Sequence, residues 1–331
     1  MSKPLLLIRT DGNNKIGMGH VYRSIALCQE MKKRGFEISF LVPRNHLVLS
    51  KLKNFATCYI TNNKQTREIS IIKKIKPDVV VIDLLKKFFP YGDSYFKSIR
   101  NFCKLSVTID YVGSESKWVD LGINYLFKPK PSKNIIYDSK YSIIRREFVK
   151  VSKKYRIKKN ADSILVIQGG ADTYCVSPKI IEALNQIDKK LEITLILGPA
   201  FKCWKEIQSV QTTNKKFTVL HNVTNMSEIM AKHQIAISAG GNTLFELLTV
   251  GVPTLIVCGE KHELEIANLI NKQNYAINLG YGPTISKNII AKNVENLLNN
   301  LDLRRTFNKN TKKIFDGNGL TRLCDLIISK L

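Results

Sequence analysis

Residues 5–31 read LLLIRTDGNNKIGMGHVYRSIALCQEM, and this stretch decides the fold class. The apolar run at residues 5–8 predicts a buried strand, and the helical pattern from residue 21 predicts an α-helix. Between them, a polar loop with several glycines delivers His20 to the start of that helix. In a parallel α/β sheet such a loop lies beyond the carboxyl end of the first strand, where ligands usually bind. The stretch therefore predicts an α/β protein with a histidine at the mouth of a site.

The alternation of apolar runs and helical patterns continues through the chain. A basic, irregular stretch at residues 150–160 separates two such series. We therefore expect two Rossmann-like domains with doubly wound parallel sheets that face a cleft, an N-terminal one at residues 1–153 and a C-terminal one at residues 154–331. The predicted strands beyond the first cover residues 36–42, 79–83, 105–110, 121–126, 163–167, 191–197, 217–220, 234–238 and 253–257.

Length and composition fit a globular protein. The chain has 331 residues, of which 44% are hydrophobic, so it has enough apolar side chains for two ordinary cores. No apolar run reaches the length of a membrane span, and the first residues lack the apolar segment of a signal peptide. We expect a soluble, cytoplasmic protein with no stable membrane insertion, and a monomer.

The seven cysteines are scattered singly along the sequence. Their number is odd and none forms a C-x-x-C pair, which argues against a disulfide framework and against a cysteine zinc site. The histidines are not spaced as metal ligands either. We therefore expect reduced, mostly buried thiols, no metal and no other cofactor.

The formal net charge of +25 raises the question of an anionic partner. A basic chain can bind nucleic acid, an anionic membrane surface or phosphorylated ligands. The excess is diffuse, and no zinc finger, helix-turn-helix or aromatic RNA-binding signature accompanies it. We interpret most lysines as a solvated face and do not predict nucleic-acid binding, although a non-enzymatic binder of nucleic acid or an anionic surface remains an alternative.

The first loop contains Gly17 and Gly19, but a third glycine for a dinucleotide fingerprint is missing and no P-loop occurs in the chain. Alone, these glycines indicate a tight turn. His20 and Arg23 place two side chains that can bind or react with a ligand after this turn. They lie on one face of the predicted helix, because residues three apart share a face. An imidazole titrates near neutral pH and can take a proton from water or an alcohol. Asp11 follows the strand that leads into this loop.

Two glycine loops in the second half are also suited to ligands. Small residues at 238–243 let the backbone approach a phosphate, and the following helix N-terminus favours an anion. Glu246 lies one turn further on, where its carboxylate could bind ribose hydroxyls or could complete a capping box with Thr243. The loop at Gly169, Gly170 and Asp172 is similarly ambiguous.

Taken together, these motifs resemble one family. Residues 9–11 with 16–23 resemble the signature of the UDP-2,4-diacetamido-2,4,6-trideoxy-β-L-altropyranose hydrolases of pseudaminic acid biosynthesis, which share the GT-B architecture of many glycosyltransferases. Further segments resemble the family's motifs in the family's order, so that the resemblance spans almost the whole chain. These segments are residues 144–148, 167–172, 238–257, 265–268 and 316–322.

The resemblance implies a GT-B fold and cleavage of the bond between a sugar and UDP. By this analogy His20 is the base that activates water, and the product is a free sugar for a nonulosonic acid of a cell-surface glycan. Enzymes of this kind need no bound metal. The substrate-binding residues that we expect from the motifs and from the resemblance together are Asp11, Gly17, Gly19, Arg23, Gly169, Gly170, Asp172, Gly240, Gly241, Asn242, Thr243, Glu246 and Asn268.

The sequence departs from the family pattern in its N-terminal half. Leu84 and Leu85 follow Asp83 where the family often carries histidine and tyrosine, Asp110 stands where the family often has paired acids, and Arg146 replaces a proline. These positions lie in the half that would bind the sugar, so they leave UDP recognition intact and leave the identity of the sugar open. The alternative function is a GT-B glycosyltransferase that transfers the sugar to a hydroxyl acceptor, because the same base would serve both reactions.

Overall fold

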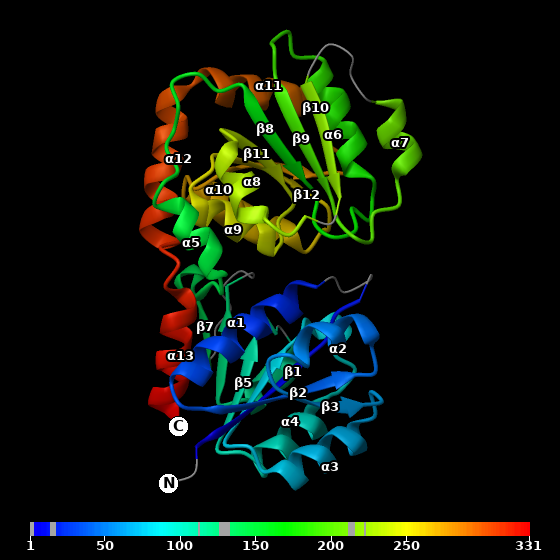
Figure 1. Cartoon of the computed structure of the whole chain (residues 1–331), viewed down its shortest axis with the longest axis vertical. Coiled ribbons are helices and arrows are strands. Elements are labelled where there is room, and N and C mark those ends of the chain that lie inside the picture. Colours follow the sequence, from blue (N-terminus) through cyan, green and yellow to red (C-terminus); the bar gives the residue numbers. More distant parts are fainter. Residues whose placement is uncertain (1–2, 14–17, 112, 126–132, 211–215, 222) are drawn as a thin grey trace. The chain divides into compact units, whose positions relative to one another are not determined.

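The computed structural model describes residues 3–13, 18–111, 113–125, 133–210, 216–221 and 223–331 (Figure 1). The chain divides into two compact units. Unit 1 comprises Met1–Ile143 together with Asn318–Leu331, and unit 2 comprises Ile144–Gly317.

Unit 1 is built on a parallel sheet with strand order β3-β2-β1-β4-β5-β6-β7 among its described residues. Helices cover both faces of the sheet, with α1 and α13 on one face and α3 and α4 on the other (Figure 1). The strands are β1 Leu5–Thr10, β2 Glu37–Pro43, β3 Thr57–Thr61, β4 Val79–Asp83, β5 Leu105–Ile109, β6 Leu121–Asn124 and β7 Ile135–Tyr137. The α-helices are α1 Gly19–Lys33, α2 His46–Leu52, α3 Gln65–Ile75, α4 Asp93–Arg100 and α13 Gly319–Lys330.

The register of the central strands of unit 1 fixes the ends of β1, β4 and β5. Thr10 pairs with Asp83, and Asp83 pairs with Ile109. The strands read as continuous apolar runs because both faces of the sheet are covered. The residues at and just beyond these paired ends, Asp11, Asp83 and Asp110, therefore stand side by side at one edge of the sheet.

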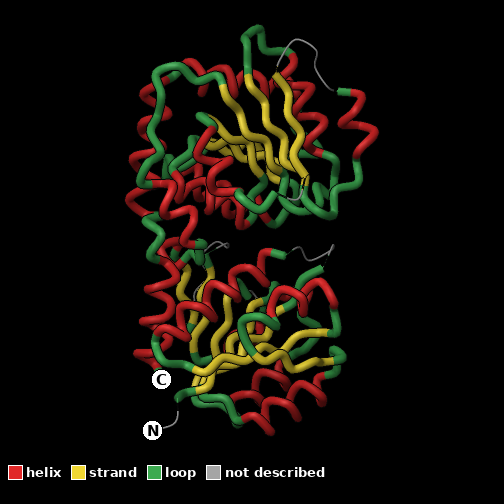
Figure 2. The backbone as a smooth tube through the Cα atoms, viewed as in Figure 1, coloured by secondary structure: helices red, strands yellow, loops and turns green. Residues whose placement is uncertain are grey.

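Unit 2 repeats the architecture with a parallel sheet of order β10-β9-β8-β11-β12-β13 among its described residues. Figure 2 shows helices on both faces of this sheet as well. The strands are β8 Ser163–Ile167, β9 Glu192–Leu197, β10 Lys216–His221, β11 Ile235–Ser238, β12 Thr254–Cys258 and β13 Ile277–Tyr281. The α-helices are α5 Arg146–Ser152, α6 Val176–Asn185, α7 Trp204–Ser209, α8 Met226–Lys232, α9 Asn242–Val250, α10 Glu263–Lys272, α11 Lys287–Asn299 and α12 Leu301–Ile314.

Strand order reverses in unit 2 between β8 and β11, the two central strands. Ile167, the last residue of β8, pairs with Ser238, the last residue of β11. The glycine loops that follow these strands therefore begin beside each other. In open parallel sheets such a switch point is the usual ligand position.

The structure confirms the predicted fold class of two Rossmann-like parallel sheets. Three edge strands, β3, β7 and β13, were not predicted from the sequence. Edge strands are covered less completely and lack the continuous apolar run of a central strand. All residues of β7 and β13 are only half-buried.

The division between the two units differs from the predicted boundary at residue 153, because unit 2 begins at Ile144 and residues 318–331 belong to unit 1. Helix α5 lies within unit 2, and α13 lies within unit 1. Helix α13 contacts α1, and Arg34 binds Asp325 across this contact. At the start of α13, a Cβ on Gly319 would lie 2.1 Å from the carbonyl oxygen of Ser142, so only glycine fits there. Such long-range packing has no local signal in the sequence.

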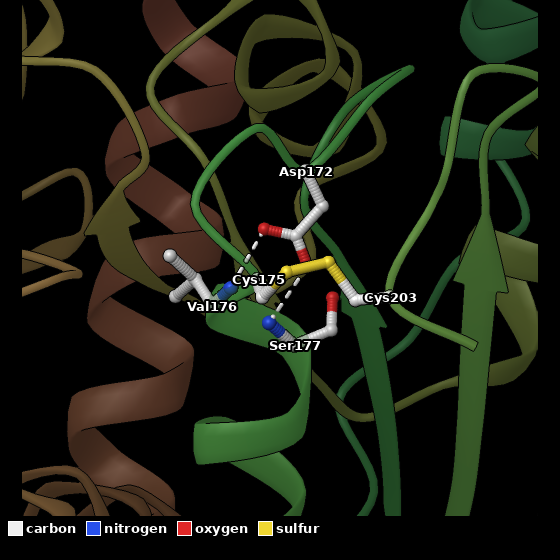
Figure 3. The surroundings of a disulfide bond; sticks show 5 residues. All are labelled: Asp172, Cys175, Val176, Ser177 and Cys203. Atoms are coloured by element: carbon white, nitrogen blue, oxygen red, sulfur yellow. Dashed lines mark hydrogen bonds between the residues drawn. A yellow bond between two sulfur atoms is a disulfide. The ribbon is translucent and has the colours of Figure 1, made fainter. Parts of the chain in front are cut away.

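Cys175 and Cys203 form a disulfide with a Cα–Cα distance of 5.8 Å (Figure 3). The prediction of unpaired thiols is therefore wrong for these two residues. They lie 28 residues apart in the sequence, and the pairing of β8 with β9 brings their loops together. The other five cysteines are free.

None of the helices in the described ranges combines the length and apolar content that a membrane span requires.

Candidate functional site

His20 lies in the first turn of α1 with only 5% of its surface exposed. Its Nδ1 is 2.8 Å from Oδ1 of Asp83, the last residue of β4. A carboxylate at Nδ1 favours the tautomer with the proton on that nitrogen, which leaves the lone pair on Nε2. The contact therefore prepares Nε2 to accept a proton.

Arg23 lies one turn after His20 and binds the same carboxylate. Its Nε is 2.7 Å from Oδ1 and 2.8 Å from Oδ2 of Asp83. Its Nη1 donates to Asp110, and also to the hydroxyl of Tyr125 at 2.9 Å. Arg23 Nη2 is 3.1 Å from His20 Nδ1 as well, but a nitrogen that donates to Asp83 cannot also accept from Arg23. We take the shorter, charge-assisted contact to the carboxylate as the bond.

This arrangement is electrostatically coupled. Burial alone raises the pKa of Asp83, but the charges and hydrogen bonds of Arg23 and His20 outweigh it, so the pKa of Asp83 is lowered. The pKa of Arg23 is raised well above its usual value by Asp83, Tyr125 and Asp110, although burial opposes them. The guanidinium of Arg23 thus donates its hydrogen bonds to protein groups. It holds Asp83 in place, and Asp83 in turn orients the imidazole of His20.

The other residues predicted around the first loop have different surroundings. Asp11 is nearly buried, and its Oδ1 accepts a hydrogen bond from the backbone N–H of Gly12 at 2.7 Å. Burial raises the pKa of this carboxyl. Gly19 is the first residue of α1, and Gly17 lies outside the described residues. Asp110 adopts a left-handed φ of 52°, which turns the chain so that its Oδ1 accepts from the backbone N–H of Tyr125 at 2.9 Å.

In unit 2, the loop at Gly240 and Gly241 leads directly into α9. Gly241 occupies the N-cap position, and no side-chain hydrogen bond caps this end. A capping box between Thr243 and Glu246 is therefore absent from this helix. A Cβ on Gly240 would lie 2.7 Å from the Cβ of Glu263, so the close approach of α10 requires glycine. The start of α9 offers the backbone donors and dipole that suit an anion.

Glu246 pairs with Arg145, which precedes α5. Arg145 Nη2 is 3.0 Å and Nε is 3.2 Å from Oε1 of Glu246. The guanidinium also lies over the ring of Phe148, 4.7 Å from its centroid. Burial raises the pKa of Glu246, whereas Arg145 acts to lower it. Arg145 belongs to the motif segment 144–148, but the sequence predicted no role for it, because its partner is 101 residues away.

The carboxylate of Asp172 is used by the protein itself. Its two oxygens accept hydrogen bonds from the backbone N–H groups of Val176 and Ser177, both at 2.8 Å, and so cap α6 (Figure 3). Burial raises the pKa of this carboxyl. Gly169 has a φ of 72°, and a Cβ on either Gly169 or Gly170 would meet nothing within 4 Å. Asp172 therefore shapes the loop, while the two glycines leave space beside it.

Asn268 is an exposed residue of α10. Its Oδ1 accepts from Nδ2 of Asn278 at 2.8 Å. Across the described part of the chain, the structure brings together no group of three or more His, Cys, Asp and Glu that could hold a metal. The site residues thus form two groups. One is a buried histidine with its carboxylate in unit 1, and the other is a glycine loop, helix N-terminus and carboxylate in unit 2.

Comparison with known proteins places these features in a family context. Residues 163–326 match the C-terminal domain of glycosyltransferase family 28. Over its whole length the chain is similar to the crystal structure of Acinetobacter baumannii MurG, with a TM-score of 0.72, 15% identity and 99% of each chain covered. The chain therefore has the GT-B fold of glycosyltransferases, and most of unit 2 matches the C-terminal domain of family 28.

Three relatives extend the comparison. The chain is 30% identical over 270 residues to the uncharacterized protein MJ1062 of Methanocaldococcus jannaschii, covering 76% of this chain but only 55% of that protein. It is 23% identical to the spore coat polysaccharide biosynthesis protein SpsG of Bacillus subtilis, covering 97% and 96%. It is 19% identical to the UDP-2,4-diacetamido-2,4,6-trideoxy-β-L-altropyranose hydrolase of Campylobacter jejuni, covering 83% and 99%.

Proposed function

We propose that this chain is an enzyme that transfers a sugar from a UDP-sugar donor to a hydroxyl acceptor, with His20 as the general base. One observation carries the proposal, namely the buried pair of His20 and Asp83 at the carboxyl edge of a parallel sheet. The match of unit 2 to family 28 supports glycosyl transfer. The relatives from Bacillus subtilis and Campylobacter jejuni are named for polysaccharide biosynthesis and for hydrolysis of a UDP-sugar respectively, which supports a UDP-sugar substrate.

The chemistry assigns a task to each group. Nε2 of His20 takes the proton of the acceptor hydroxyl, whose oxygen attacks the anomeric carbon. The bond from that carbon to the β-phosphate oxygen breaks, and UDP leaves with the electron pair. Asp83 stabilises the imidazolium that forms. In unit 2, the start of α9 binds the diphosphate and Glu246 accepts hydrogen bonds from the ribose hydroxyls.

A second candidate is hydrolysis of the UDP-sugar, with water in place of the acceptor. It is supported by residues 16–23, which resemble the signature of the pseudaminic acid pathway hydrolases, and by the Campylobacter jejuni relative. The free amino sugar would then serve nonulosonic acid synthesis. In both reactions the same nitrogen removes a proton from the attacking oxygen.

Phosphorus NMR of UDP release tests both candidates. The protein is incubated with a panel of UDP-sugars, with and without hydroxyl acceptors. UDP release that depends on the acceptor assigns transfer, and stoichiometric release without it assigns hydrolysis. His20→Ala should slow either reaction by roughly 100-fold or more, the usual contribution of a general base. His46→Ala is the matched control because His46 is an exposed histidine of the same unit. Undiminished release by His20→Ala would contradict the assignment of the base.

The absence of a nucleic-acid partner remains a prediction, as does the monomeric state. A filter-binding titration with RNA at low and moderate salt addresses the first. Binding driven by the net charge would be steeply salt-dependent and indifferent to UDP. Tight UDP binding with little RNA retention would favour the enzyme.

A further inference from the structure

The disulfide between Cys175 and Cys203 joins two loops at the carboxyl edge of the unit 2 sheet. Cys175 precedes α6 in the loop that follows β8, and Cys203 precedes α7 in the loop that follows β9 (Figure 3). The first of these loops contains Gly169, Gly170 and Asp172. The bond therefore acts on a loop that the sequence analysis assigns to substrate binding.

The two loops are also packed tightly against each other. A Cβ on Gly198 would lie 2.4 Å from the Cα of Gly170, so the backbones touch. The N–H of Ala200 donates to the carbonyl of Gly170 at 3.0 Å. The loop that carries Cys203 therefore contacts the other loop directly at Gly170.

The loop after β8 has a backbone that must be held in place. Asp172 and Cys175 have φ angles of 43° and 51°, in the left-handed region that side chains other than glycine seldom adopt. Such residues persist only where their surroundings constrain them. Two constraints are visible in Figure 3: the hydrogen bonds from α6 to Asp172, and the disulfide. Reduction removes the second and leaves the first.

The remaining thiols differ from this pair. Burial raises the pKa of Cys28 to about 11 and that of Cys103, Cys258 and Cys324 to about 12. They stay protonated and are poor nucleophiles at neutral pH. Cys175 is only half-buried and follows two exposed residues, whereas Cys203 is buried, so Cys175 is the more accessible of the two to an external thiol. Disulfides in reducing compartments are usually transient and catalytic or redox-sensing, and their state follows that of the surrounding thiols.

We propose that the Cys175–Cys203 disulfide is a redox-controlled clamp that holds the Gly169–Gly170 loop in its ligand-binding form, an inference that rests on the proposed UDP-sugar site in unit 2. A low-molecular-weight thiol attacks Sγ of Cys175, the bond between the two sulfurs breaks, and Cys203 leaves as a thiolate that takes up a proton. A second thiol releases Cys175 and forms the low-molecular-weight disulfide. Two thiols are oxidised, the protein disulfide gains their two electrons, and the reverse exchange restores the clamp.

Two measurements on the full chain test the clamp. UDP binding is measured by calorimetry before and after reduction with glutathione, with free thiols counted by alkylation and mass spectrometry. Hydrogen exchange of residues 169–175 is measured on the same samples. Reduction should weaken UDP binding at least fivefold and speed exchange in this loop. Where UDP binds, either equal affinity or equal exchange in the two states would overturn the clamp.

Two variants separate the clamp from general effects of thiols and from the proposed function. Cys175→Ser combined with Cys203→Ser should behave as the reduced protein under both conditions. Cys103→Ser, which removes a free and only half-buried cysteine, should respond to reduction as the unmodified chain does. Faster exchange on reduction in a protein that binds no UDP in either state would support the clamp and contradict the UDP site. Unchanged exchange would overturn the clamp whether or not UDP binds.

Discussion

His20 Nδ1 lies 2.8 Å from Asp83 Oδ1, and Arg23 binds both oxygens of the same carboxylate. One acid therefore orients the histidine and is itself held by a cation. Asp110 gives Arg23 a second anionic partner. Two carboxylates, Asp83 and Asp110, therefore surround the single guanidinium of Arg23.

Replacement of Asp83 with asparagine should separate orientation from binding. Asparagine keeps the size of the side chain, but its amide can donate to Nδ1 and so favour the wrong tautomer of His20. We expect kcat for UDP release to fall by roughly 100-fold with KM little changed. Asp93→Asn, which alters a partly exposed carboxylate near Lys117 in the same unit, is the control. A variant with a raised KM and an unchanged kcat would contradict the positioning role.

The same substitution should change how stability depends on pH. The pKa of Asp83 is lowered in the folded protein, so its contribution to stability is complete above the unfolded value of about 3.9 and is lost as pH falls through the folded value. At pH 7 we expect Asp83→Asn to reduce the free energy of unfolding by about 3 kcal/mol, the typical cost of breaking a buried ion pair. Urea unfolding between pH 3 and 7 measures the difference. The difference in the free energy of unfolding between the unmodified chain and Asp83→Asn should become smaller below about pH 4. A difference that does not change with pH would show that it does not arise from ionisation of Asp83.

Glu246 and Glu147 offer a matched pair of tests, because both bind Arg145. Arg145 Nη2 is 3.0 Å from Glu246 and Nη1 is 2.8 Å from Glu147. Glu246→Ala should weaken UDP binding by about 10-fold or more, as expected for the loss of hydrogen bonds to a charged group. Glu147 is the more exposed of the two, and Glu147→Ala should change the affinity by less than about twofold. Calorimetry with UDP measures both, and equal losses would indicate that Arg145 rather than Glu246 contacts the ligand.

The raised pKa of Glu246 should also make UDP affinity depend on pH. Burial raises its pKa, so the carboxylate that accepts hydrogen bonds is lost at a higher pH than for an exposed glutamate. UDP affinity should therefore fall on acidification before an exposed carboxylate would titrate. This dependence should be absent from Glu246→Ala, which tests whether it originates from this group.

The sequence predicted the parts of the site that local patterns encode. The apolar runs placed Asp83 and Asp110 at strand ends, and parallel pairing then explains why both reach Arg23. Contacts between distant segments gave no such signal. Arg145 meets Glu246 across 101 residues, and Cys175 meets Cys203 through the pairing of β8 with β9. The capping box at Thr243 fitted the sequence but not the structure, because the N-cap position belongs to Gly241.

Arg304 is a fully buried cation whose partners are backbone carbonyls. Its Nη1 donates to Leu297 at 2.7 Å and to Leu298, and its Nη2 donates to Lys159 at 2.8 Å and to Lys158 at 3.3 Å. Leu297 and Leu298 belong to the last turn of α11, whose carbonyls lack helical partners and favour a cation. Burial lowers the pKa of Arg304. The hydrogen bonds to these carbonyls hold its guanidinium in place.

Arg304→Met should therefore destabilise unit 2, because methionine fills part of the space but leaves several buried carbonyls without donors. We expect a loss of about 3 kcal/mol in the free energy of unfolding. Arg305→Met is the control, since Arg305 is 64% exposed and lies 3.8 Å from an exposed Asp302. Its effect should stay within about 0.5 kcal/mol. Urea unfolding of the two variants decides the question. Equal stability would show that water replaces the guanidinium at these carbonyls.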